Sequence, residues 1–169
     1  MAYGYDPRLM DAGAGSIVHE FDRLVNRYFA LFTDRSTERM AWLQQAEMAI
    51  AELYGAGLRL PNTEPSDQDP PEMPIGDQRR LMTEIVDRIG GDSIPYSFVF
   101  HPLEMSADPV VGSLADDLAS IYRDLYEGSA WLATGGAVED VIWTWRVNFQ
   151  IHWGRHALGA LQALNDMLR

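Results

Sequence analysis

Residues 113–132 constrain the fold more than any other part of the sequence. Apolar residues recur there at spacings of four, three, four, three and four, namely Leu114, Leu118, Ile121, Leu125, Gly128 and Leu132. This spacing places all six on one side of an α-helix, as in a helix that packs in a bundle. Ser113 followed by Asp116 is typical of a helix N-terminus, because the serine oxygen can accept a hydrogen bond from a backbone N–H of the first turn.

A second long helix follows after a short link. The pair Gly135 and Gly136 ends the first helix, and apolar residues return at helical spacing over residues 138–167. Two apolar lines run along this second segment, so we expect the helix to be covered on two sides. So short a link favours antiparallel packing, and the sequence therefore predicts a helical hairpin.

Three more helices are predicted in the first half of the chain. Apolar residues recur at helical spacing over residues 16–31, 37–58 and 79–89. Residues 1–15 contain three glycines and one proline with little periodicity, so they are predicted to form a flexible lead-in.

Two segments do not fit a helix. Residues 61–76 contain five prolines among acidic side chains, which predicts a long exposed loop. Tyr96, Phe98 and Phe100 alternate as in a β-strand, but no other segment alternates, so we expect one extended aromatic segment without a partner strand. The predicted fold is an all-α bundle of about five helices, formed as a single domain by residues 16–169.

Composition excludes several kinds of chemistry. The 169 residues include no cysteine and no lysine, which excludes thiolate metal sites, cysteine nucleophiles and lysine Schiff bases. The formal net charge of −12 argues against binding to nucleic acid or to anionic membranes, and it favours a basic protein partner. The first residues lack the pattern of a secretory signal, and no uncharged stretch is long enough to cross a bilayer, so we expect a cytoplasmic protein.

Four side chains of the two C-terminal helices are candidates for a metal site. His152 and His156 lie one turn apart on one helical face, a separation at which two imidazoles can share a metal ion. Asp117 and Asp124 lie on one face of the preceding helix, and antiparallel packing would bring them opposite the histidines. The four groups could bind Zn²⁺, Mn²⁺ or Fe²⁺ and activate a water molecule. The alternative is a structural set of buried His–Asp hydrogen bonds that needs no cofactor.

Trp153 argues against one metal-dependent activity. In zinc proteases of the His-Glu-x-x-His type, the residue after the first histidine is the general base. Trp153 follows His152 in this chain and offers no base.

Two stretches of the chain resemble a known family. Residues 109–128 (PVVGSLADDLASIYRDLYEG) and 143–156 (WTWRVNFQIHWGRH) are similar to the two hallmark segments of a bacterial family of uncharacterised all-helical proteins, a domain-of-unknown-function family. Together they cover about a fifth of the chain. The resemblance implies a small all-α bacterial protein, and it brings no reaction, ligand or catalytic residue with it.

Three functions remain open from the sequence. The acidic composition favours a non-enzymatic protein-binding bundle, such as an adaptor or inhibitor that engages a basic protein, and this is the hypothesis that we prefer. An aromatic-rich helical hairpin also allows a homodimer interface, through Trp131, Trp143, Trp145, Phe149 and Trp153. The main alternative is a metal-dependent hydrolase built on the His/Asp group, and a small-molecule-binding bundle with an aromatic pocket is the third. No cofactor is expected under the first hypothesis, and a divalent metal under the second.

Overall fold

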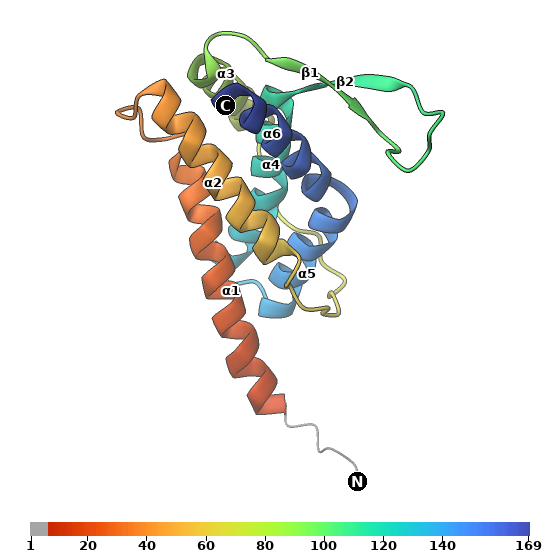
Figure 1. Cartoon of the computed structure of the whole chain (residues 1–169). Helices are drawn as coiled ribbons and strands as arrows, with labels where there is room; N and C mark the ends of the chain where they lie inside the picture. The colour runs from red at the N-terminus through yellow and green to blue at the C-terminus, as the bar shows by residue number, and fades with distance from the viewer. Residues whose placement is uncertain (1–6) are drawn as a thin grey trace.

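The computed structural model describes the backbone of residues 7–169 and the side chains of residues 15–169. Its elements in chain order are α1 (Pro7–Ala30), α2 (Arg39–Gly57), α3 (Ile75–Ile89), β1 (Pro95–Val99), β2 (Pro109–Ser113), α4 (Leu114–Ala133), α5 (Val138–Asn148), a π-helical turn (Phe149–Trp153) and α6 (Gly154–Leu168). Since α5, the π turn and α6 follow without a break, the described residues form five helical rods and one two-stranded hairpin (Figure 1). The predicted all-α bundle of about five helices is confirmed. Within this part of the chain, no helix combines the length and apolar character needed to cross a membrane.

The helical hairpin predicted from the glycine link is present. α4 begins with the predicted cap, because Ser113 Oγ accepts a hydrogen bond from the Asp116 backbone N–H at 3.3 Å. Leu118 and Ile121 of the apolar stripe are fully buried. Gly135 turns the chain with a φ of +81°, which favours glycine, and α4 then packs along both α5 and α6.

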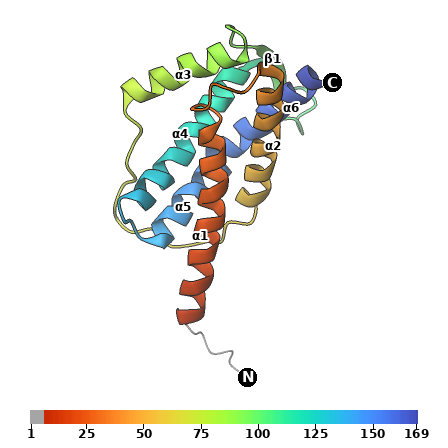
Figure 2. The same ribbon diagram turned by 90° about the vertical axis from the view of Figure 1, so that its left-hand side faces the viewer.

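The N-terminal helices complete the core. α1 packs on α2, α4 and α5, and α2 packs on α6 (Figure 2). The polar ends of the buried aromatic side chains are bonded: Tyr28 donates to the Leu118 carbonyl at 2.8 Å, and Trp42 donates to the Leu31 carbonyl at 2.7 Å. Both rings are therefore buried in the core with their polar atoms hydrogen-bonded.

The extended aromatic segment has a partner strand, so that part of the prediction was wrong. β1 pairs antiparallel with β2, with Tyr96 opposite Gly112 and Val99 opposite Pro109. The sequence of β2 gave little indication of a strand, because its five residues include proline and glycine and do not alternate between apolar and polar. The hairpin projects from the bundle beside α6 (Figure 1).

The first helix and the proline-rich loop also differ in detail from expectation. α1 begins at Pro7, within the stretch predicted as a lead-in, and residues 1–6 of that stretch lie outside the described residues. The connection between α2 and α3 has no regular structure, as predicted. It is nevertheless tied to α5, because the backbone N–H and the hydroxyl of Ser66 donate to the buried carboxylate of Asp140 at 2.6 and 3.0 Å.

Candidate metal site

A π-helical turn positions the first of the two histidines. The Gly154 N–H donates to the carbonyl of Phe149, five residues earlier, where an α-helix would use the residue four positions earlier. A Cβ atom at position 154 would lie 2.4 Å from that carbonyl oxygen, so the turn requires glycine. Single π turns of this kind often occur at functional sites, and His152 lies within this one. The sequence predicted an uninterrupted α-helix here.

The structure brings the four predicted side chains together. His152 Nδ1 lies 2.8 Å from Asp124 Oδ2, and His156 Nδ1 lies 2.8 Å from Asp117 Oδ1. The two Nε2 atoms face each other at 3.3 Å. Each imidazole is therefore held through Nδ1 by a carboxylate of α4 and directs its Nε2 toward the other imidazole.

This row of contacts needs one more proton than two neutral imidazoles supply. Its three hydrogen bonds, Asp to His, His to His and His to Asp, require three protons, and two neutral imidazoles carry two. Burial raises the pKa of Asp124, while the hydrogen bond from His152 acts in the opposite direction, so this carboxyl group is one place for the third proton. The other place is between the two Nε2 atoms, where a proton or a metal ion would supply the missing positive charge.

The cluster is open to solvent on the His152 side. The His152 side chain is 46% exposed, whereas that of Asp117 is 6% exposed. His152 and Asp124 border a hollow of about 300 Å³ whose lining also includes Glu72 and Glu127. Burial, together with the nearby charge of Asp124, raises the pKa of Glu127. The hollow is lined by three acidic side chains and one arginine, Arg123, and this excess of negative charge favours the approach of cations from solvent.

Asp117 has a second partner that the sequence did not reveal. Tyr96 of β1 donates its hydroxyl to Asp117 Oδ2 at 2.6 Å, so both carboxylate oxygens are bonded. Burial, and then the hydrogen bond to this carboxylate, raises the pKa of Tyr96. The tyrosine passes between two glycines: a Cβ at Gly112 would lie 2.7 Å from its ring, and a Cβ at Gly159 would lie 2.1 Å from its hydroxyl.

The spacing of the two Nε2 atoms suits a shared metal ion. Zinc–imidazole bonds are about 2.0–2.1 Å long, so two such ligands at a tetrahedral angle lie about 3.3–3.4 Å apart. The observed separation is 3.3 Å. Metal-bound histidines commonly donate their other nitrogen to a carboxylate, which is the role that Asp117 and Asp124 would have. Among the described residues, no three histidine or acidic side chains meet as a ready-made ligand set, so the protein would contribute two ligands.

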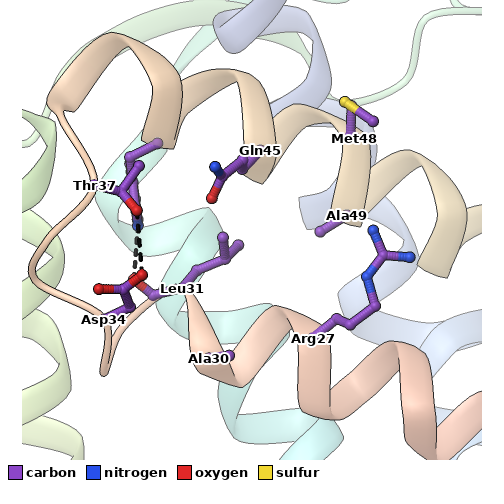
Figure 3. A pocket seen from close by; sticks show the side chains of 9 residues that line it. Arg27, Ala30, Leu31, Asp34, Thr37, Gln45, Met48 and Ala49 are labelled. Carbon is purple, nitrogen blue, oxygen red and sulfur yellow. Dashed lines mark hydrogen bonds between the residues drawn. The ribbon is translucent and has the colours of Figure 1, made fainter.

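A second hollow lies between α1 and α2, and no histidine is among the described residues that line it (Figure 3). Its lining includes Leu31 and two charged groups that are already paired. Asp34 accepts a hydrogen bond from Thr37, and Arg27 forms an ion pair with Glu52. The His/Asp cluster is therefore the stronger candidate for a functional site.

Comparison with known proteins identifies the family. A model described as "Domain of unknown function (DUF5063)" matches residues 14–169. The chain belongs to this family. The match includes every residue of the His/Asp cluster, and it confirms the predicted resemblance to a domain-of-unknown-function family.

A similar fold is known from a crystal structure. Protein BF1032 from Bacteroides fragilis, a structural genomics target, is similar to this chain with a TM-score of 0.73 and 19% sequence identity. The likeness covers 90% of this chain and 92% of that one. At this identity it concerns the fold alone. No curated protein matches the chain.

Proposed function

We propose that this DUF5063 chain binds one divalent transition-metal ion between the Nε2 atoms of His152 and His156. The observation that carries the proposal is the 3.3 Å separation of these atoms, while both Nδ1 atoms are bonded to carboxylates. With a shared proton, two carboxylates leave the cluster with a formal charge of −1. A divalent ion in place of that proton makes the cluster neutral, which favours the metal in a partly buried position.

The ligand atoms indicate the class of metal. Imidazole nitrogens suit Zn²⁺, Cu²⁺, Ni²⁺ and Fe²⁺, whereas Mg²⁺ and Ca²⁺ prefer oxygen ligands. Two protein ligands leave the remaining coordination positions to water. We therefore expect weaker binding than in structural zinc sites, in which the protein supplies four ligands.

Metal-linked stability tests this function. Thermal melts of wild type, His156→Ala and Asp117→Asn are recorded with a chelator and with added Zn²⁺. We expect the midpoint of wild type to rise with free Zn²⁺ as binding linkage requires, and to rise little in either variant. His19→Ala, which removes an exposed histidine of α1, is the matched control and should behave as wild type. A wild-type midpoint that is the same with chelator and with Zn²⁺ would show that the cluster is only structural.

If the metal site is catalytic, we expect it to catalyse hydrolysis. A metal ion with open coordination positions lowers the pKa of a bound water and makes it a nucleophile near neutral pH. The assay compares zinc-loaded wild type with His152→Ala on simple carboxylic and phosphate esters. Turnover that requires zinc and is lost in the variant supports a hydrolase, and equal background rates support a binding protein.

A protein-binding role is the second candidate function, and the β1–β2 hairpin favours it. Leu103 and Met105, in the connection between its strands, are each 98% exposed, and Val111 is 79% exposed. Apolar side chains gathered on a projecting segment are typical of contact surfaces. The net charge of −12 favours a basic protein over a second copy of this acidic chain.

This second candidate is tested with a variant of the hairpin. The double variant Leu103→Ser, Met105→Ser is compared with Met48→Ser, which changes an exposed apolar side chain of α2. A basic protein that binds wild type and Met48→Ser but not the double variant would support the proposal. If wild type and Met48→Ser instead form a concentration-dependent dimer and the double variant does not, the hairpin contacts a second copy of the chain.

A further inference from the structure

We propose that Tyr96 is a positioning residue of the metal site, and that it couples metal binding at His152 and His156 to the docking of the β1–β2 hairpin on the bundle. This inference rests on the metal-binding function proposed above. It adds a means by which the site and the hairpin affect each other.

One carboxylate joins the hairpin to the histidines. Asp117 accepts from Tyr96 through Oδ2 at 2.6 Å and contacts His156 Nδ1 through Oδ1 at 2.8 Å. Its side chain is only 6% exposed, so water cannot easily replace a lost partner. If Tyr96 leaves, Oδ2 is an unsatisfied buried acceptor, and the carboxylate is expected to turn away from the orientation that holds His156.

Two glycines leave room for the side chain of Tyr96 to reach Asp117. Gly112 faces Tyr96 across the hairpin, and Gly159 of α6 lies beside its hydroxyl. A Cβ atom at either position would come within 2.7 Å of the tyrosine side chain. The hairpin meets α6 at a second point, where the guanidinium of Arg155 lies 3.9 Å from the centre of the Phe100 ring. Both contacts lie on the face of the bundle that carries the histidines.

Linkage then requires an effect in both directions. A metal ion that fixes His156 also favours the orientation of Asp117 that binds Tyr96, so the metal is expected to shift the equilibrium of the hairpin toward its docked form. By reciprocity, undocking of the hairpin weakens metal binding by the same factor.

Hydrogen exchange with and without metal tests the coupling. Amide exchange in residues 95–113 is measured with chelator and with saturating Zn²⁺ in wild type, Tyr96→Phe and Gly159→Ala. We expect Zn²⁺ to slow exchange in wild type and to have little effect in either variant. The first variant removes the hydroxyl and keeps the ring. The second keeps the tyrosine but places a Cβ atom 2.1 Å from its hydroxyl and 3.2 Å from Asp117 Oδ2. Phe98→Leu changes a ring 5.9 Å from that of Tyr96 without touching Asp117, so it should keep the response to Zn²⁺.

A zinc titration of the same proteins separates the two proposals. Loss of an outer-shell partner commonly weakens metal binding 10- to 100-fold, and Tyr96 is one contact further away, so we expect Tyr96→Phe to weaken it by about 3- to 10-fold. Absence of zinc binding in wild type would overturn the proposed function, and the coupling with it. Zinc binding in wild type that is unchanged or tighter in Tyr96→Phe would overturn the coupling alone, as would a hairpin whose exchange does not respond to zinc.

Discussion

Gly128→Ala should destabilise the protein although it replaces glycine within a helix. Gly128 lies in α4 against the indole of Trp145, and a Cβ atom there would be 2.4 Å from the indole Nε1. Trp145 is fully buried, and its Nε1 donates to the Leu125 carbonyl at 3.0 Å. The added methyl group therefore must displace the indole and strain or break this hydrogen bond.

The magnitude follows from three opposing effects. Alanine in place of glycine within a helix gains about 1 kcal/mol from helix propensity. Overpacking of a well-packed core costs about 1–3 kcal/mol. A buried donor that loses its partner costs about 1–3 kcal/mol more. The net expectation is a loss of about 1–5 kcal/mol in the free energy of unfolding.

Urea unfolding of a matched pair of variants tests this expectation. A Cβ at Gly55 in α2 would meet only Arg59 Nη1, at 3.7 Å, so Gly55→Ala should show the propensity gain of up to about 1 kcal/mol. The two substitutions are chemically identical and should change stability in opposite directions. If Gly128→Ala also stabilises the protein, the packing of Trp145 against α4 is not as described.

Three further predictions concern the core, a carboxyl group and the loop. Leu118→Ala should lower the free energy of unfolding by about 2–5 kcal/mol in urea titrations, because the leucine is fully buried, and a near-neutral effect would mean that the stripe is not in the core. Burial raises the pKa of Glu127, so its contribution to stability is complete below its ordinary value of 4.5 and is lost as the pH rises through the folded-state pKa. Glu127→Gln should therefore gain stability relative to wild type when unfolding is measured at about pH 7 instead of about pH 4, and a difference independent of pH would contradict this. Asp140→Ala removes the acceptor of Ser66, so limited proteolysis should cut residues 61–76 faster than in wild type, and equal rates would show that this contact does not hold the loop.

Periodicity and one short link were enough to predict the helical hairpin and the approach of the four site residues. The stripe of α4 sets one face, and the two-glycine link allows antiparallel packing, so the histidines of the last helix come opposite Asp117 and Asp124. The two carboxylates lie two turns apart beside the stripe, and both reach the imidazoles. The prediction needed only local spacing and chain reversal.

The remaining features depend on contacts that local spacing does not reveal. The π turn accommodates one extra residue beside Gly154 and shifts the buried line of the last helix by one position, so that Trp153 is buried and His152 is exposed. β2 was missed because its pairing is set by β1 and not by its own composition. Tyr96 was missed as a partner of Asp117 because the contact joins residues 21 positions apart through a slot beside Gly159.

Calorimetric titration with Zn²⁺ tests the metal site most directly. The titration is run in two buffers that differ in ionisation enthalpy, so that proton release is measured together with binding. We expect one Zn²⁺ per chain and release of about one proton, since the ion replaces the proton between the two imidazoles. Binding should be lost in His152→Ala and in His156→Ala and retained in His19→Ala. No binding by wild type, or binding that survives both substitutions in the cluster, would contradict a metal site at these histidines.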